Sequence, residues 1–330
     1  MNREQQRTLG ESPAFLRILE EVSLVAPLEK PVLVVGERGT GKELIAARLH
    51  FLSNRWEEQF LKMNCAAISD SLLESELFGH EAGSFTGASK THHGRFERAH
   101  RGTLFLDELG STSPLVQEKL LRIIEYGEFE RVGGNKTLYC DVRLIAATNR
   151  DLPSLAESGK FRSDLLDRLA FDVLTLPPLR ERDTDIMLLA EHFAVGMTHE
   201  LKREYFPGFS REAKQALEEY AWPGNVRELK NVVERCVYRN DAEKEITEVL
   251  FDPFDSPYRP IGKADRAEAK HNVTTLPLDL KQTVREFEIE LLNRSLAEAK
   301  HNQRKAAELL KLTYHQLRGY LKKYELLKSD

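Results

Sequence analysis

Short apolar runs alternate with helical patterns along the first half of the chain. Five runs rich in β-branched and aliphatic side chains are typical of buried strands and cover residues 31–35, 60–64, 102–106, 142–147 and 171–176. The segments around them are mostly helical in their apolar spacing, as residues 9–27 and 43–52 are. This alternation predicts a parallel sheet covered by helices on both faces, with ligands bound at the carboxyl ends of its strands.

The second half of the chain has helical patterns only. We expect an α/β unit over residues 1–176 and a helical unit over 177–250, which follows Pro177-Pro178. Residues 251–278 lose periodicity and gather prolines and charges, as a linker does. Residues 279–330 hold a long helix and two short ones around a three-residue turn, which indicates a helix-turn-helix, with a purely structural helical hairpin as the alternative.

Charge is unevenly distributed along the chain. The 330 residues carry a net charge of −5, which predicts no general affinity for polyanions. Residues 300–328 nevertheless hold eight lysines and arginines against two glutamates, so the basic charge coincides with the predicted helix-turn-helix and favours DNA binding there. Because there is no signal peptide, no apolar run that reaches across a bilayer and no C-x-x-C pair, we expect a cytoplasmic protein without membrane insertion.

The first strand runs into a phosphate-binding loop. Gly36-Glu-Arg-Gly-Thr-Gly-Lys42 matches G-x-x-x-x-G-K between a strand and a helix, whereas the alternative is an ordinary strand-to-helix turn. Such a loop directs backbone N–H groups and a lysine at a polyphosphate. Its nucleotide-binding residues would be Gly36, Glu37, Arg38, Gly39, Thr40, Gly41, Lys42 and Glu43. Since Glu43 stands where Ser or Thr usually supplies a hydroxyl to Mg²⁺, the metal must be held by phosphate oxygens, water and an acid elsewhere.

Polar residues follow three other predicted strands. Asp107 and Glu108 end the third run, where one carboxylate can hold Mg²⁺ through water and its neighbour can take a proton from an attacking water. Thr148 and Asn149 end the fourth run and suit contact with a terminal phosphate. Asn64 ends the second run, where it is expected to reach Glu108. A surface acidic pair and satisfied turn residues are the alternatives.

Three arginines and one loop complete the candidate chemistry. Arg162 and Arg168 are suited to stabilising charge on a transferring phosphoryl group in trans, with a local salt bridge as the alternative. Arg227 falls in the first turns of a helix that Pro223-Gly-Asn begins. Glycines 79, 83 and 87 exclude a regular helix around Phe85, which is either displayed or tucked into the body. We read no metalloenzyme motif, because His80-Glu81 is not H-E-x-x-H.

These motifs, taken in order, resemble one family. The set consists of Gly36–Glu43, Gly83–Ala88, Asp107-Glu108, the arginine pair, Trp222-Pro-Gly-Asn-Val-Arg-Glu-Leu229 and the terminal helix-turn-helix. It is similar to that of the bacterial enhancer-binding proteins, AAA+ ATPases that activate sigma-54 RNA polymerase. The resemblance covers nearly the whole chain and implies a parallel five-stranded sheet, a helical AAA+ lid and a DNA-binding domain. A replication initiator or helicase loader would lack the Gly83–Ala88 loop, and a non-catalytic repressor would not need Glu108 and both arginines.

The resemblance also implies roles for the residues. ATP and Mg²⁺ would be the cofactors of a hexameric ring, in which Asn64 couples Glu108 to conformational change and Arg227 reports bound nucleotide to the lid. Thr148 and Asn149 would sense the γ-phosphate, and Arg162 and Arg168 would act on the neighbour's nucleotide. The sigma-54 contacts would be Gly83, Ser84, Phe85, Thr86, Gly87, Ala88, Arg131 and Val132. The contacts to double-stranded enhancer DNA would be Thr313, Tyr314, His315, Gln316, Arg318, Lys322 and Lys323.

Two positions depart from the family pattern, and one feature concerns control. Ser84 stands where Ala is usual, and Lys311 stands in the helix-turn-helix where Gly is preferred; if that position needs a positive φ, lysine costs about 1 kcal/mol there. We expect no sensor domain ahead of the ATPase, a feature of the branch of this family that serves phage-shock promoters. We therefore expect a repressing partner in trans, with Trp56 as a candidate contact; a Trp folded onto its own domain is the alternative.

Overall fold

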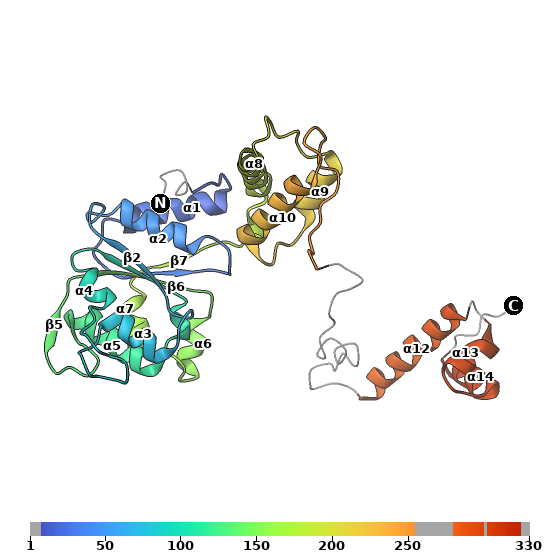
Figure 1. Cartoon of the computed structure of the whole chain (residues 1–330). Coiled ribbons are helices and arrows are strands. Elements are labelled where there is room, and N and C mark those ends of the chain that lie inside the picture. The colour runs from blue at the N-terminus through green and yellow to red at the C-terminus, as the bar shows by residue number, and fades with distance from the viewer. Residues whose placement is uncertain (1–7, 255–279, 300–301, 325–330) are drawn as a thin grey trace. The chain divides into compact units, whose positions relative to one another are not determined.

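Figure 1 shows the computed structural model of the chain, which describes residues 8–254, 280–299 and 302–324. The chain divides into two units, Met1–Pro253 and Phe254–Asp330. The linker that we predicted at residues 251–278 lies almost entirely outside the described residues. None of the helices that the structure describes is long and apolar enough to cross a membrane.

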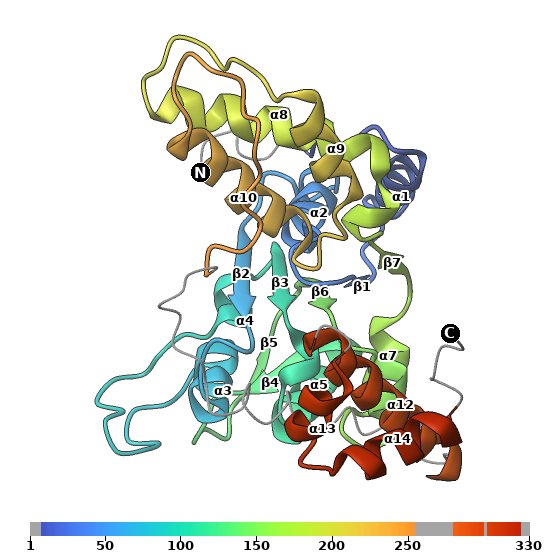
Figure 2. The same ribbon diagram turned by 90° about the vertical axis from the view of Figure 1, so that its right-hand side faces the viewer.

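A parallel five-stranded sheet forms the centre of the first unit, as predicted. Its strands are β1 (Val32–Val35), β2 (Phe60–Asn64), β3 (Thr103–Asp107), β6 (Arg143–Thr148) and β7 (Val173–Thr175). They lie in the order β2-β3-β6-β1-β7, which Figure 2 shows from left to right. A second, antiparallel sheet of β4 (Glu128–Glu130) and β5 (Thr137–Tyr139) was not predicted.

Helices cover both faces of this sheet (Figure 1). One face carries α1 (Pro13–Val25) and α2 (Lys42–Phe51); the other helices are α3 (Asp70–Phe78), α4 (Arg95–Arg98), α5 (Pro114–Tyr126), α6 (Leu152–Glu157) and α7 (Ser163–Leu169). Because successive strand residues point to opposite faces, Val32 and Val34 pack into the core under α1 and α2, whereas Leu33 packs into the core on the other face. The apolar run of β1 is buried on both sides for this reason.

The lid follows β7 in the same unit. It begins with η3 (Leu179–Glu181) and continues with α8 (Asp183–Glu200), α9 (Arg211–Glu219) and α10 (Asn225–Arg239). Trp222 is fully buried in its core, and its indole Nε1 donates to the Leu217 carbonyl over 2.8 Å. This bond satisfies the one polar group of a large apolar side chain.

The second unit contains α12 (Leu280–Glu298), α13 (Gln303–Leu309) and α14 (Tyr314–Lys323) around a small core. Thr313 caps α14, as its position indicates, and accepts from the Gln316 N–H over 3.3 Å. Lys311, in the turn between α13 and α14, has a φ of +53°, so this position does adopt the left-handed conformation that favours glycine.

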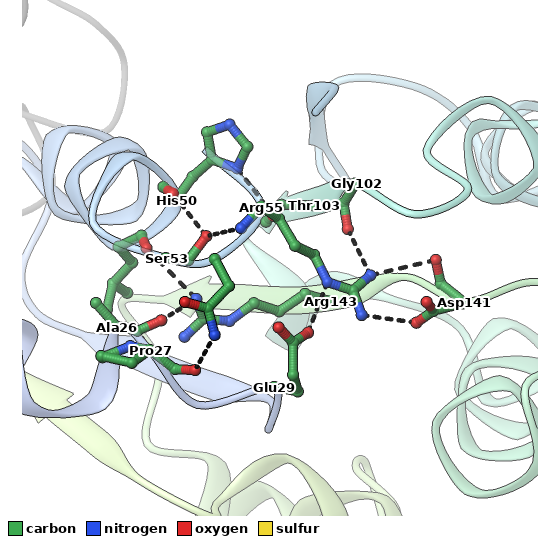
Figure 3. A network of polar contacts seen from close by, with 12 residues as sticks. Ala26, Pro27, Glu29, His50, Ser53, Arg55, Gly102, Thr103, Asp141 and Arg143 are labelled. Atoms are coloured by element: carbon green, nitrogen blue, oxygen red, sulfur yellow. Dashed lines mark hydrogen bonds and ion pairs between the residues drawn. The ribbon is translucent and has the colours of Figure 1, made fainter. Parts of the chain in front are cut away.

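A polar network joins α1, α2 and the amino ends of the strands (Figure 3). The buried Arg143 guanidinium donates to the carbonyl oxygens of Ala26 (2.6 Å) and Val25 (3.1 Å), at the C-terminal end of α1, where the helix dipole favours a cation. Arg55, in the loop after α2, pairs with Glu29 at 2.6 Å and with Asp141 at 2.7 Å. These contacts hold the amino ends of the strands, at the end of the sheet opposite to the phosphate loop.

Candidate functional site

The phosphate loop joins β1 to α2 and surrounds the ammonium group of Lys42. Gly39 and Gly41 have φ values of +80° and +98°, which favour glycine and turn the backbone around the loop. Lys42 is 7% exposed, and its Nζ donates to the carbonyl oxygens of Gly36 (2.8 Å) and Glu37 (3.0 Å). The lysine is therefore held inside the loop.

Charges of both signs surround Lys42. Burial lowers the pKa of Lys42; Asp107 and Glu108 counteract that shift, and Arg227 and Arg38 add to it. The loop, the two carboxylates and the arginine of the lid therefore lie within electrostatic reach of one ammonium group, although they come from three separate segments of the chain.

The two predicted carboxylates lie at the tip of β3. Asp107 ends the strand, and its Oδ1 accepts from the Glu108 N–H over 2.9 Å. Glu108 has a φ of +55°, a left-handed conformation that is costly for a residue other than glycine and clusters at functional sites. The strained residue is therefore Glu108, which the sequence analysis expects to take a proton from the attacking water.

The other strand tips place Thr148 beside the loop and leave Asn64 exposed. Thr148 is fully buried, and its carbonyl accepts from the Gly36 N–H over 3.2 Å. Asn149 is exposed next to it. Asn64 pairs in register with Asp107, and its side-chain oxygen accepts from the Ala66 N–H over 2.9 Å. The predicted contact from Asn64 to Glu108 stays a prediction.

The carboxylates at this site suit a Mg²⁺ ion whose ligands are mostly water and phosphate oxygens rather than protein atoms. Within the part of the chain that the structure describes, no three His, Cys, Asp or Glu side chains form a cluster able to hold a metal. Glu43 pairs with Lys62 at 2.8 Å. Two adjacent carboxylates beside a phosphate loop suit Mg²⁺, which binds through one or two carboxylates, water and substrate phosphates.

The paired arginines both form salt bridges. Arg162 pairs with Asp164 of its own stretch at 2.7 Å. Arg168 pairs instead with Glu125 at the end of α5, also at 2.7 Å. Side-chain exposures of 41% for Arg162 and 60% for Arg168 leave both guanidinium groups accessible, and exposed pairs of this kind are weak.

The glycine-flanked loop and the hairpin loop between β4 and β5 lie side by side. Glu81 N–H donates to the Val132 carbonyl (3.1 Å), and Val132 N–H donates to the Gly79 carbonyl (2.9 Å). Arg131 pairs with Glu81 at 2.7 Å. A second pair joins Arg131 to Glu97 at 2.6 Å. The structure therefore brings together the two segments to which the sequence assigns sigma-54 contacts.

The Phe85 side chain is partly displayed. It is 44% exposed, and its ring contacts the His80 ring edge-on at a centroid distance of 4.9 Å. Gly83 and Gly87 on either side have φ values of +86° and +109°. The two alternatives that the sequence left open are thus combined: the ring packs on the base of its own loop while nearly half of it faces solvent.

Most of the predicted DNA-contacting side chains lie on the exposed surface of the second unit. Thr313, His315, Gln316, Arg318, Lys322 and Lys323 are exposed, and Tyr314 is half-buried. Lys323 lies 3.6 Å from the Glu288 carboxylate and also over the Tyr324 ring, so it contacts its own domain. Gln316 completes the cap of α14 by accepting from the Thr313 N–H over 2.9 Å.

Trp56 is presented to solvent. It is 56% exposed and directly follows Arg55 in the chain. Figure 3 shows the ion pairs of Arg55 with Glu29 and Asp141. More than half of the Trp56 surface is therefore accessible to a partner, as the candidate contact requires.

Sequence reasoning missed one part of the site. Glu37 was expected to bind nucleotide as part of the loop, but its carboxylate contacts Arg180 at the start of the lid and Asn225 at the start of α10. The only sequence signal was Pro223-Gly-Asn225, which marked a helix start without naming its partner.

Comparisons with known proteins agree with this arrangement. Residues 8–175 match the family described as "Sigma-54 interaction domain", residues 180–256 the "AAA+ ATPase lid domain", and residues 283–324 the "Bacterial regulatory protein, Fis family". The chain is 58% identical to the Psp operon transcriptional activator of Escherichia coli, over 96% of this chain and 98% of that protein. It is 41% identical to the E. coli regulatory protein AtoC over 98% of this chain and 68% of AtoC.

Solved structures are similar as well. The crystal structure of NtrX from Brucella abortus has a TM-score of 0.70 and 30% identity, and covers 97% of this chain and 69% of NtrX. NtrX in complex with ATP gives a TM-score of 0.69 at 30% identity, over 96% of this chain and 69% of NtrX.

Proposed function

The chain belongs to the sigma-54-interacting AAA+ transcriptional activators, and we propose that it opens sigma-54 promoters of the phage-shock, or membrane-stress, response. As a member it is a sigma-54-dependent activator that binds and hydrolyses ATP, and its Fis-type domain binds DNA. The single observation that carries the phage-shock assignment is the similarity to the E. coli Psp operon activator over essentially the full length of both proteins.

In the proposed ATPase site, Lys42 and the loop bind the phosphates of ATP. Asp107 would hold Mg²⁺ through water, and the bound metal would neutralise charge on the phosphate oxygens. Glu108 takes the proton of the attacking water, and Asn64 couples Glu108 to the loops. Thr148 and Asn149 respond to the γ-phosphate. The electrostatic effect of Asp107 and Glu108 on the Lys42 ammonium supports the roles of these three residues.

We further propose a hexameric ring in which Arg162 and Arg168 act on the neighbour's nucleotide. Both guanidinium groups are accessible, and their surface ion pairs are weak enough to exchange for a phosphate. Arg227, on the lid, reports the nucleotide of its own subunit.

The Gly83–Ala88 loop, assisted by Arg131 and Val132, contacts sigma-54 when ATP is turned over. The exposed Phe85 ring and the hydrogen bonds between the two loops support this assignment. Movement of the loops converts the closed promoter complex to an open one. The exposed polar side chains of α14 contact enhancer DNA, where they read base edges.

Control is proposed to come from a repressor in trans, similar to the phage-shock A protein, that docks on the loop carrying Trp56. Repression of ATP turnover by that partner tests the proposal. We expect Trp56→Ala to escape repression, while Phe51→Ala, which removes another exposed aromatic ring (45%, against 56% for Trp56) at the end of α2, stays repressed. Normal repression of Trp56→Ala would remove this contact from the proposal.

The promoter assignment has its own test. Single-round transcription with sigma-54 polymerase should yield open complexes at a phage-shock promoter with its enhancer, and fewer at a sigma-54 promoter whose enhancer belongs to another activator. Equal activation of both promoters would contradict the phage-shock assignment.

A further inference from the structure

The second residue of the phosphate loop points its side chain at the lid. Arg180 of η3 donates to both carboxylate oxygens of Glu37, over 2.6 Å and 3.1 Å. Asn225, the first residue of α10, donates from Nδ2 to the same carboxylate over 3.0 Å. The loop that holds phosphate is therefore hydrogen-bonded to two separate segments of the lid.

Asn225 connects these segments to one another. It is fully buried, its Oδ1 accepts from the Leu179 N–H over 2.8 Å, and its Nδ2 also donates to the Arg38 carbonyl over 3.1 Å. Its φ of +52° is strained for a residue other than glycine and persists only where the surroundings hold it. One amide thus joins the loop, η3 and α10.

The loop and α10 are also in direct contact. A Cβ at Gly39 would lie 2.3 Å from the Gly224 carbonyl oxygen and 3.1 Å from the Arg227 Cβ. No space separates the loop from the first turn of α10, so a change in the loop backbone displaces that turn and the guanidinium two residues after Asn225.

The contact is charged throughout the neutral range. Hydrogen bonds from Arg180 and Asn225 lower the pKa of Glu37 to about 2. The carboxylate is therefore ionised at any pH at which the protein would be assayed, and the contact does not open on a change of pH near neutrality.

We propose that Glu37, Arg180 and Asn225 form a clasp that fixes the lid to the phosphate loop and positions Arg227 at the bound nucleotide. This inference rests on the proposed function of Arg227. The three residues act as positioning residues: they hold the first turn of α10 at the loop, so that phosphate binding and lid position change together.

A double-mutant cycle between Arg180→Gln and Arg227→Ala tests the clasp in the full-length protein. The readouts are the Kd for ADP, by titration calorimetry, and KM and kcat for ATP. Arg180 is 44% exposed, so its loss should not unfold the lid. We expect Arg180→Gln to weaken ADP binding about two- to fivefold, the range of an exposed ion pair, and to raise KM more than it lowers kcat.

The matched variants decide between positioning and a general structural effect. Arg180→Lys keeps the charge but not the two-pronged contact, so it should restore part of the affinity, and Arg211→Gln, on the exposed start of α9, should change nothing. If the clasp acts through Arg227, Arg180→Gln has no further effect in the Arg227→Ala background. If Arg180→Gln weakens ADP binding equally in the wild-type and Arg227→Ala backgrounds, the clasp is wrong but the role of Arg227 stands. If Arg227→Ala itself leaves ADP binding and ATP turnover unchanged, the proposed role of Arg227 is wrong and the clasp with it.

Discussion

The Asp185 carboxylate joins the lid to the first helix, and its replacement tests how strongly this junction is held. Asp185 is fully buried on α8, and it accepts from the Ser12 N–H (2.9 Å) and the Ser12 hydroxyl (2.7 Å). It pairs with Arg182, itself 3% exposed, at 2.8 Å. Burial raises the pKa of Asp185, but hydrogen bonds from Glu11, Ser12 and Arg182 outweigh it, so the net pKa is lowered.

The change Asp185→Asn keeps the shape and removes the charge. Removing one partner of a buried ion pair costs about 3–5 kcal/mol because the other charge stays buried. Since the amide oxygen still accepts one hydrogen bond, we expect a loss near the lower end, about 3 kcal/mol. The lowered pKa means that the carboxylate contributes fully above its unfolded-state pKa. Its contribution is lost as the pH falls through the folded-state pKa, so the difference between wild type and variant should shrink in acid.

Urea unfolding in a Trp56→Phe background measures this difference. The chain has two tryptophans, so Trp222, buried in the lid core, becomes the sole reporter. Asp183→Asn, an exposed carboxylate in the same turn, is the matched control and should shift the free energy of unfolding by less than about 0.5 kcal/mol. An Asp185→Asn variant no less stable than Asp183→Asn would refute the reasoning.

Three further changes have defined outcomes. Lys311→Gly should stabilise the helix-turn-helix by up to about 1 kcal/mol in thermal unfolding, because glycine relieves the positive φ, whereas Lys311→Ala should give no such gain. Ser84→Ala should raise stability by about 1 kcal/mol, since the Ser84 hydroxyl is buried without a partner among the described residues; a clear loss would contradict this. Glu108→Gln should lower ATP turnover at least about 100-fold while ADP still binds, and unchanged turnover would exclude Glu108 as the base.

The strands and the strand-tip residues were predictable because their signals are local. An apolar run such as Val32–Val35 identifies a buried strand by itself, and parallel topology then brings Asp107 and Thr148 to one edge. The helix-turn-helix was predictable for the same reason, including the cap at Thr313.

The missed features have no local signal. The β4 strand is only Glu128-Phe-Glu130 and pairs only with β5 among the described strands, so its short alternation resembles a turn. The contacts of Glu37 join residues 143 and 188 positions apart, and only the folded chain brings them together. The same holds for Arg168, whose partner Glu125 lies outside the acidic stretch that suggested a local salt bridge.

The central claim is that the Phe85 loop couples ATP turnover to promoter opening. Single-round transcription from a sigma-54 promoter, with ATP turnover measured in parallel, tests this coupling most directly. Wild type should open the promoter, and Phe85→Ala should hydrolyse ATP without opening it. Phe51 is 45% exposed, close to the 44% of Phe85, so Phe51→Ala is the matched control. This variant should hydrolyse ATP and open the promoter. A Phe85→Ala variant that opens the promoter as well as wild type, at equal ATP turnover, would contradict the account.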